Sequence, residues 1–461
     1  MNEKTLYKSV AELSRMIRAK QISPVELTSA YLKRAQALDP QLFAVVTFTE
    51  ELAIAQAKQA EREVMKGKFR SPLHGIPWGV KDLFATAGIP TQWGSSVYRN
   101  QIFDYDATIV RKLHDAGAVL IGKLASGELA SGARWFRGTT RCPWDSLRSS
   151  SGSSAGPGAA TAAGMVGFSI GTETLGSIMS PSGVNGVVGL RPTYGRVSRH
   201  GAMVLSWTMD KVGPMCRSVE DCALVFDVIA GSDPLDPTAV DAQFRFSPQV
   251  SIKGRKIGVL RDEFNFASDA EVAVAFRNAL EKLESLGLIL EDVQLDNYAY
   301  QDIARYTINI EAASVFESLW KTDNIDMMIN KQRAVDWSAA RMLPAVDYLK
   351  MQRLRTEISD YASALFKKYS ALVAPTLSAP AGLVEVVEIP TANPLGSLTG
   401  GSFAFGNIVG VPAVSVPCGF TSTNLPLGLQ FIGPAFDESG ILRLAHAYEQ
   451  ANNWYERHPR L

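Results

Sequence analysis

Apolar and polar positions in the first 66 residues follow the period of helices. Apolar side chains recur at helical spacing over residues 10–17, and the segment SPVE at 23–26 has the form of a capping box with proline at the first helical position. A second helix is therefore predicted to begin there and run through Leu38, and an alanine-rich stretch predicts a third helix over residues 50–65. We expect these helices to serve packing rather than chemistry.

From residue 73 onward, short apolar runs broken by glycine and proline alternate with helical stretches. This alternation is typical of an α/β sheet enzyme. The Gly- and Ser-rich segment 149–201 contains repeated apolar runs, so we interpret it as part of the sheet rather than as a low-complexity segment. Further strands are predicted at 118–123, 256–260, 371–377 and 411–420, and further helices at 107–116, 270–286, about 298–369 and 441–451.

The chain shows no internal repeat and no obvious linker. We therefore predict one large domain over residues 1–461, with a helical N-terminal segment at 1–66 and a second helical region at about 298–369.

Charge and composition narrow the classes of partner. Lys plus Arg and Asp plus Glu are both 46, so the formal net charge is zero, which argues against nucleic acid or an anionic membrane because both attract a basic surface. No run approaches the ~20 apolar residues of a membrane span, and the N-terminus lacks a signal-peptide pattern. We expect a cytoplasmic protein, monomeric or homodimeric, without a nucleic-acid or membrane partner.

Familiar catalytic and cofactor motifs are missing. The sequence has no G-x-S-x-G elbow, no H-E-x-x-H, no P-loop and no dinucleotide fingerprint. None of the five histidines has a compelling partner, so a Ser-His-Asp mechanism is not favoured, and the four cysteines lack metal-ligand spacing. We expect neither a metal nor a cofactor.

Two Ser- and Gly-rich clusters and one lysine remain as candidate chemistry. The runs at 149–158 and 171–178 are either loops or backbone that presents N–H groups beside a serine hydroxyl, as a nucleophile with an oxyanion hole requires. Lys81 ends an apolar strand, where burial would lower the pKa of its amine and make it a base. The alternative is an ordinary ion pair between Lys81 and Asp82; because neighbouring residues on a strand point to opposite faces, we expect Asp82 to face away.

These clusters, in this order, resemble the amidase-signature family. The likeness covers nearly the whole chain, and the segments that carry it are GIPWGVKD, the Ser/Gly run at 149–158, GTETLGSIMSP, GVVGLRPTYGRVSRHG, MDKVGPMCRSVEDCALVFDVIAG, VPAVSVPCGF and LPLGLQFIGP. The resemblance implies a single α/β/α domain around a large mixed sheet, and a free-standing amidase of the bacterial type.

The resemblance also implies roles for individual residues. Lys81 matches the base, Ser153 the bridging serine that the family usually holds through a cis peptide, and Ser177 the nucleophile. Ser154 matches a serine that supports this triad. The oxyanion hole corresponds to the backbone N–H groups of Thr174, Leu175, Gly176 and Ser177.

Five positions depart from the family pattern. Ser151, Ala155 and Leu175 stand where glycine is usual, Glu173 replaces a more common aspartate, and Met179 replaces a frequent arginine. Leu175 deprives the oxyanion loop of glycine freedom, and Met179 predicts that an ion pair supporting the loop is absent. Both departures argue against the glutaminase subunit of a tRNA-dependent amidotransferase.

The leading hypothesis is therefore an amidohydrolase for small amides, aryl acylamides or carbamates (urethanes), with ester hydrolysis by the same route. The glutaminase (A) subunit of a tRNA-dependent amidotransferase is the alternative. The helical region at 298–369 is expected to form a wall of the substrate pocket. Bulky apolar residues expected near its mouth are Trp135, Phe136, Trp207, Phe403 and Phe405.

Overall fold

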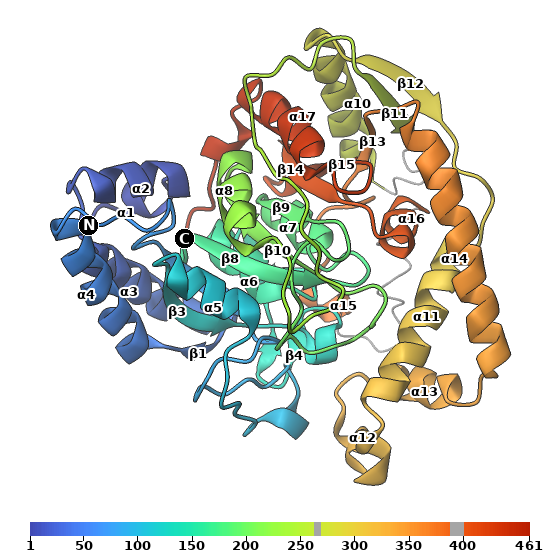
Figure 1. Ribbon diagram of the computed structural model, residues 1–461, viewed down its shortest axis with the longest axis horizontal. Coiled ribbons are helices and arrows are strands. Elements are labelled where there is room, and N and C mark those ends of the chain that lie inside the picture. Colours follow the sequence, from blue (N-terminus) through green and yellow to red (C-terminus); the bar gives the residue numbers. More distant parts are fainter. Residues whose placement is uncertain (262–268, 388–400) are drawn as a thin grey trace.

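A large mixed β-sheet organises the computed structural model, which describes residues 1–261, 269–387 and 401–461. Its eleven strands lie in the order β1-β3-β2-β8-β10-β9-β14-β15-β13-β11-β12 (Figure 1). The strands are β1 (Val45–Phe48), β2 (Pro77–Lys81), β3 (Val119–Leu124), β8 (Phe168–Glu173), β9 (Val188–Arg191), β10 (Lys211–Cys216), β11 (Lys256–Leu260), β12 (Ile289–Val293), β13 (Ala371–Pro375), β14 (Ala413–Phe420) and β15 (Pro426–Ile432). Two small ribbons pair β4 (Arg134–Trp135) with β5 (Gly138–Thr139) and β6 (Arg141–Cys142) with β7 (Asp145–Ser149).

The sheet mixes parallel and antiparallel pairs. β2 runs parallel to both β3 and β8, and β11 runs parallel to β12 and β13. The antiparallel pair β14–β15, close to the C-terminus, lies between β9 on one side and β13 on the other. The last strands of the chain therefore join two halves of the sheet that were built from earlier residues.

Both faces of the sheet are buried under helices. On β13, Ala371 and Val373 join one apolar cluster while Leu372 and Ala374 join another, as the alternation of side chains along a strand requires. Helices α10 (Ala270–Ser285) and α17 (Glu438–Gln450) contribute to the first cluster, and α11 (Tyr300–Val315), α14 (Ala345–Phe366) and α16 (Gly401–Val409) contribute to the second. This arrangement confirms the predicted α/β fold with a central mixed sheet.

The N-terminal segment forms the three predicted helices, α2 (Val10–Arg18), α3 (Pro24–Leu42) and α4 (Glu50–Met65), together with a short α1 (Glu3–Leu6) that was not predicted. All four are grouped on the left of Figure 1. Ser23 caps α3 with Pro24 in its first turn, and its hydroxyl donates to Glu61 of α4. The complete reciprocal capping box lies instead at α2, between Ser9 and Glu12.

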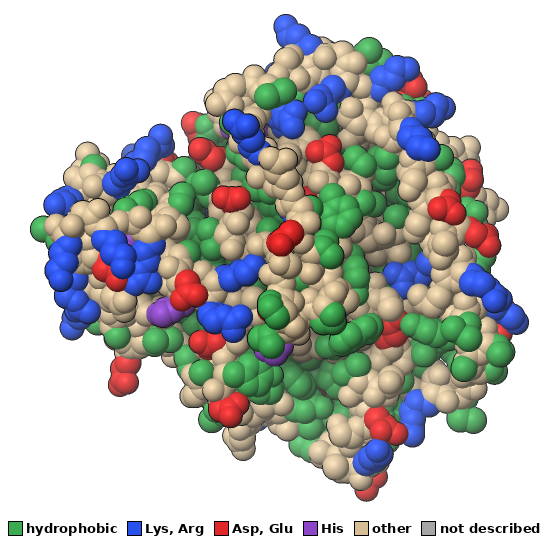
Figure 2. All heavy atoms as spheres, viewed as in Figure 1, with side chains coloured by type: hydrophobic (Ala, Val, Ile, Leu, Met, Phe, Trp, Pro, Cys, Tyr) green, Lys and Arg blue, Asp and Glu red, His purple; other side chains and the backbone are tan. Residues whose placement is uncertain are grey.

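The second helical region lies at the opposite side of the molecule, on the right of Figure 1. It breaks into α11, α12 (Ser318–Lys321), α13 (Lys331–Ala340) and α14, with a short 3₁₀ turn at Asn324–Met327. Figure 2 shows the surface hollowed between this region and the sheet-bearing body, with apolar side chains along the hollow. None of the described helices has the length and apolar character needed to cross a membrane.

Other helices fill the connections. They are α5 (Thr108–Asp115), α6 (Ala155–Ala162), α7 (Met179–Asn185), α8 (Val219–Ile229) and α15 (Val384–Val387), with 3₁₀ turns at Ser96–Tyr98, Glu128–Ala130 and Trp454–Glu456. α6 packs against β2, β3 and β8, and α7 packs against β9, β14 and β15. These two helices follow the two Ser- and Gly-rich clusters, so the clusters lie over the middle of the sheet.

Candidate active site

Lys81 is the last residue of β2, in the half of the sheet where β2 is flanked by parallel neighbours. Its side chain is fully buried. The Nζ atom lies 2.8 Å from Ser153 Oγ, 3.0 Å from Ser154 Oγ and 2.8 Å from Thr172 Oγ1. The structure thus brings together the lysine and the two adjacent serines that the sequence singled out, and adds Thr172.

The three hydroxyls suit the amine of Lys81 in either protonation state. Ser154 donates its own proton to the Thr172 carbonyl at 3.0 Å, so it accepts from Lys81. A charged ammonium has three N–H donors, one for each hydroxyl, whereas a neutral amine has two N–H donors and one lone pair. In the neutral form, either Ser153 or Thr172 donates to that lone pair.

Burial lowers the pKa of Lys81 well below its ordinary value, against the carboxylates of Asp210 and Glu173, which raise it. Asp82 has no part in this balance. Its side chain is buried beside Lys123, with Oδ1 3.2 Å from Nζ, and its Oδ2 accepts from the backbone N–H of Gln92 at 2.9 Å. The prediction that Asp82 faces away from Lys81 is confirmed, and the alternative of a Lys81–Asp82 ion pair is wrong.

Ser153 lies in a tight turn between β7 and α6. The Gly152–Ser153 peptide bond is cis, and the Ser153 carbonyl accepts from the N–H of Gly127 at 3.2 Å. A Cβ on Gly152 would lie 1.9 Å from the Gly132 carbonyl oxygen, so only glycine fits there. Ser151 has a φ of 57°, in the left-handed region, which explains physically why glycine is usual at its position.

Ser177 follows a second tight turn, at the end of β8. Gly176 has a φ of 87°, and a Cβ there would lie 3.1 Å from Ser180 Oγ and 3.5 Å from the Phe403 ring. The Ser177 carbonyl accepts from the N–H of Ser154 at 3.2 Å, which fastens the two serine loops together. Leu175, by contrast, is not in the left-handed region, so leucine replaces glycine there without backbone strain.

Glu173 anchors the loop that carries Ser177. Its Oε2 accepts from the N–H groups of Ile178 and Met179 at 2.8 and 3.0 Å. Its Oε1 accepts from Arg191 Nη1 and from Asn407 Nδ2, both at 2.9 Å, and both members of the Glu173–Arg191 pair are buried. The expectation that Met179 leaves this loop without an ion pair is wrong, because Arg191 reaches the loop from β9.

Burial alone would raise the pKa of Glu173, but Arg191, Lys211 and the hydrogen bonds from Met179 and Arg191 together hold it below its ordinary value. Glu173 is therefore a buried carboxylate that stays ionised. The fixed negative charge and its four donors hold the turn between β8 and α7 in one conformation.

Two residues near the site were missed by the sequence analysis. Thr172 contacts Lys81, and Asp210 accepts a hydrogen bond from Thr174 Oγ1 at 2.5 Å. Both lie inside segments that carry the family likeness, GTETLGSIMSP and MDKVGP, but only the pairing of β8 with β10 brings Asp210 to Thr174.

The five aromatic residues expected at the pocket mouth lie in different surroundings. Trp135 and Phe405 are fully buried, and Phe403 packs beside Gly176 in the loop that carries Ser177. Phe136 stacks edge-on against Trp135, with ring centroids 5.1 Å apart. Trp207 is 55% exposed.

A metal site would need a cluster of ligand side chains, and a disulfide would need two bonded cysteines. Within residues 1–261, 269–387 and 401–461, no group of three His, Cys, Asp or Glu side chains could hold a metal. All four cysteines are buried and unpaired with one another.

The family model for amidases matches residues 26–442. The chain belongs to the amidase-signature family. It is a hydrolase acting on carbon–nitrogen bonds, as the sequence resemblance implied. Among relatives, the A subunit of the glutamyl-tRNA(Gln) amidotransferase from Moorella thermoacetica is 37% identical, with 99% of each chain covered.

Solved amidase-family structures share this fold over nearly the full chain. The peptide amidase of Stenotrophomonas maltophilia is 32% identical, with 98% of each chain covered and a TM-score of 0.85. The A subunit of the glutamyl-tRNA(Gln) amidotransferase from Thermotoga maritima is 28% identical, with 93% of this chain and 91% of that chain covered and a TM-score of 0.77. A chain from a vestigial protein complex related to an s-triazine catabolic enzyme is 29% identical, with 96% and 99% covered and a TM-score of 0.88.

Proposed function

We propose that this amidase cleaves carboxamides through an acyl-enzyme on Ser177, with Ser153 as the proton shuttle and Lys81 as the base. The observation that carries the proposal is the environment of Lys81. A fully buried amine has three hydroxyls as hydrogen-bond partners, and Ser153 is one of them. Burial favours the neutral form, which is the form that accepts a proton.

The proposed reaction begins with a proton relay. Lys81 takes the Ser153 proton while Ser153 takes the Ser177 proton, and Ser177 Oγ attacks the substrate carbonyl. The oxyanion that forms is bound by the N–H groups of Thr174, Leu175, Gly176 and Ser177, in the loop that Glu173 anchors. The relay then reverses and protonates the leaving nitrogen, and water cleaves the acyl-enzyme by the same path.

The comparisons support glutamine as the amide substrate, whereas the departures from the family pattern at Leu175 and Met179 argued against it. Curated relatives at 34–37% identity are amidotransferase A subunits. Two physical objections to a glutaminase lose their force, because Leu175 needs no glycine conformation and Arg191 supplies an ion pair to the loop. We therefore propose glutaminase activity, in the manner of these relatives, ahead of hydrolysis of free-standing small amides, aryl acylamides or carbamates.

A panel assay on the purified chain separates these substrates. Ammonia release from glutamine is compared with hydrolysis of a peptide amide, an anilide, a carbamate and an ester, and gel filtration reports whether the chain is a monomer or homodimer. A glutamine rate above all others supports the glutaminase. Efficient anilide or peptide-amide turnover with no glutaminase activity supports the free-standing amidase, for which the fold of the peptide amidase is the structural argument.

The nucleophile is tested by Ser177→Ala. The variant is expected to lose all hydrolysis while keeping the unfolding midpoint of the parent, and a fluorophosphonate is expected to label Ser177 alone in the parent enzyme. Turnover above a few per cent of the parent rate, or a label on another serine, would refute the assignment.

A further inference from the structure

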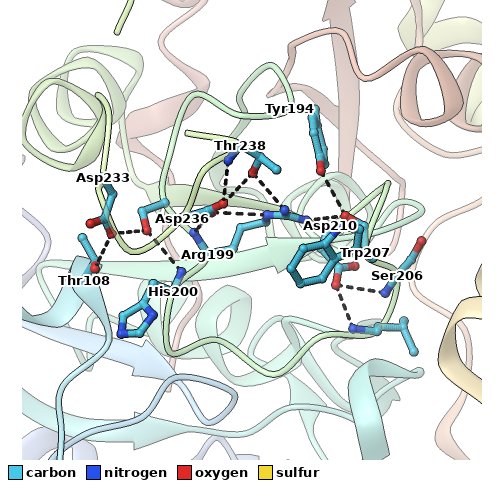
Figure 3. Close-up of polar contacts among 12 residues, drawn as sticks. Thr108, Tyr194, Arg199, His200, Ser206, Trp207, Asp210, Asp233, Asp236 and Thr238 are labelled. Carbon is cyan, nitrogen blue, oxygen red and sulfur yellow. Dashed lines mark hydrogen bonds and ion pairs between the residues drawn. The ribbon is translucent and has the colours of Figure 1, made fainter. Parts of the chain in front are cut away.

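A six-residue loop, Leu205 to Asp210, connects the oxyanion loop to the second helical region. At one end Asp210 Oδ1 accepts from Thr174 Oγ1 at 2.5 Å. The other carboxylate oxygen accepts from the N–H groups of Leu205 and Ser206 at 2.7 and 3.0 Å (Figure 3). Three donors therefore converge on one half-buried carboxylate, which closes the loop on itself and ties it to Thr174.

The other side of this loop is held by Glu311 of α11. Its Oε2 accepts from Ser206 Oγ at 2.6 Å and from the Thr208 N–H at 3.0 Å, and its Oε1 accepts from Thr208 Oγ1 at 2.7 Å. Tyr348 of α14 donates to the same Oε1 at 2.8 Å. Arg355, also on α14, donates to Thr208 Oγ1 and to the Thr208 carbonyl.

We propose that Asp210 is a positioning residue, which orients the Thr174 N–H toward the oxyanion, and that Glu311 holds Asp210 in place from the second helical region. This inference rests on the proposed function, because it assigns a role in the oxyanion hole. Thr174 has two relevant groups: its N–H is one of the proposed oxyanion donors, and its hydroxyl is bound to Asp210. Rotation of the side chain or of the Glu173–Thr174 backbone would break the 2.5 Å hydrogen bond, so the contact limits both.

Asp210 has a second, electrostatic effect on the site. Its carboxylate raises the pKa of Lys81 against burial, and Glu173 acts in the same direction. The cations near these two carboxylates are Arg199 and Arg333 around Asp210, Arg191 around Glu173, and Lys211 near both. Removing the Asp210 charge leaves Glu173 as the remaining carboxylate that raises the Lys81 pKa, so that pKa falls further.

Two substitutions test the hydrogen bond with and without a change of charge. Thr174→Val removes the hydroxyl but keeps the N–H, the β-branched shape and the Asp210 charge. Asp210→Asn removes the charge and also places an NH₂ group among three donors, so it disturbs the hydrogen bonds as well. The chain supplies a matched control in Thr108 and Asp233, which form an equally short hydrogen bond of 2.5 Å between buried side chains away from the oxyanion loop (Figure 3). Thr108→Val and Asp233→Asn report what such a bond contributes to folding alone.

Thr174→Val is expected to lower kcat by about 10- to 100-fold and to leave KM within about twofold of the parent value. This loss is smaller than the ~10²- to 10³-fold loss of kcat that follows deletion of an oxyanion donor, because the N–H itself remains. The loss is equal for ester and amide substrates, because both form the same oxyanion. Asp210→Asn shows the same loss, and the inflection of its kcat/KM profile moves to lower pH, whereas Thr174→Val leaves the inflection in place. Glu311→Gln lowers kcat in the same direction without moving the inflection.

Parent-like kcat in Thr174→Val, or losses equal to those in the Thr108→Val and Asp233→Asn controls, would overturn the inference. Parent-like kcat in Glu311→Gln would overturn the part assigned to α11. Should Asp210→Asn fail to fold, Thr174→Val decides the matter alone. Ser177→Ala, measured in parallel, distinguishes failure of this inference from failure of the proposed function. If Ser177→Ala retains activity, the proposed function fails. If Ser177→Ala is inactive while Thr174→Val has the parent kcat, only this inference fails.

Discussion

Glu173→Gln tests whether a buried charge holds the loop that carries Ser177. The substitution keeps the size of the side chain and removes its charge. All four partners of Glu173 are donors: Arg191 and Asn407 on one oxygen, and the N–H groups of Ile178 and Met179 on the other. The new amide has one acceptor oxygen and one NH₂ group, so two of these donors must face another donor.

The magnitude follows from the burial of the ion pair. Side-chain exposure is 1% for Arg191 and 0% for Glu173, so the variant leaves a guanidinium without its counter-charge in the interior. Breaking one side of such a pair typically destabilises by about 3–5 kcal/mol, because the remaining ion keeps its desolvation cost. We expect the free energy of unfolding to fall by that amount, and kcat to fall with it, because the loop that carries Ser177 loses its anchor.

The assay is equilibrium urea unfolding at pH 7, monitored by tryptophan fluorescence. The free energies of unfolding of parent and variant are compared from curves fitted with the same m-value. The matched control is Glu317→Gln, which removes one member of the solvent-exposed Glu317–Lys321 pair on one helical turn. This control is expected to unfold with the parent. A loss below 1 kcal/mol in Glu173→Gln would refute the reasoning, since Arg191 would then be stable without an ionised partner.

Three further predictions concern proton transfer and pH. Lys81→Ala is expected to abolish nearly all amide hydrolysis. In the parent enzyme, kcat/KM should rise with pH to a plateau as the amine of Lys81 becomes neutral. If the residual activity of Lys81→Ala showed the same inflection, another group would be the base. Ser153→Ala should damage amide cleavage more than cleavage of an activated ester, whose leaving group needs no proton, and equal losses would contradict the shuttle. Burial raises the pKa of Glu449 to about 8, from an ordinary 4.5, so the native state holds a proton that the unfolded chain has released, and stability falls as pH rises through that interval. Glu449→Gln should therefore gain urea resistance relative to the parent between pH 5 and pH 8, and parallel stability curves would contradict this.

Much of the fold could be predicted where a signal lies within one segment of the sequence. α4 was predicted over the residues that it occupies from an alanine-rich stretch, and β11 from a short apolar run, because both signals depend on near neighbours in sequence. α16 was missed because GSFAFGNIV is apolar on nearly every side and contains glycine, so no helical face stands out. β1 was missed because four residues carry too little pattern.

The sequence singled out Lys81, Ser153 and Ser177, whose catalytic roles stay predictions, but not the residues that support them. Lys81, Ser153 and Ser177 lie in distinctive local segments, whereas Thr172 reaches Lys81 across 91 residues and Asp210 reaches Thr174 across 36. Arg191 reaches Glu173 from a strand that pairs with neither β2 nor β8. Such contacts depend on which strands become neighbours, and a single sequence does not specify that order through spacing.

The position of β14 and β15 has a consequence for synthesis of the chain on the ribosome. Because these strands lie between β9 and β13, an emerging chain that ends before residue 413 exposes an unpaired edge on each half of the sheet. Long-range pairing of this kind is slow to form and leaves apolar edges open to aggregation. We therefore expect nascent chains to depend on chaperones until residues 413–432 have emerged, and deletions that remove this hairpin to yield insoluble protein rather than a smaller folded enzyme.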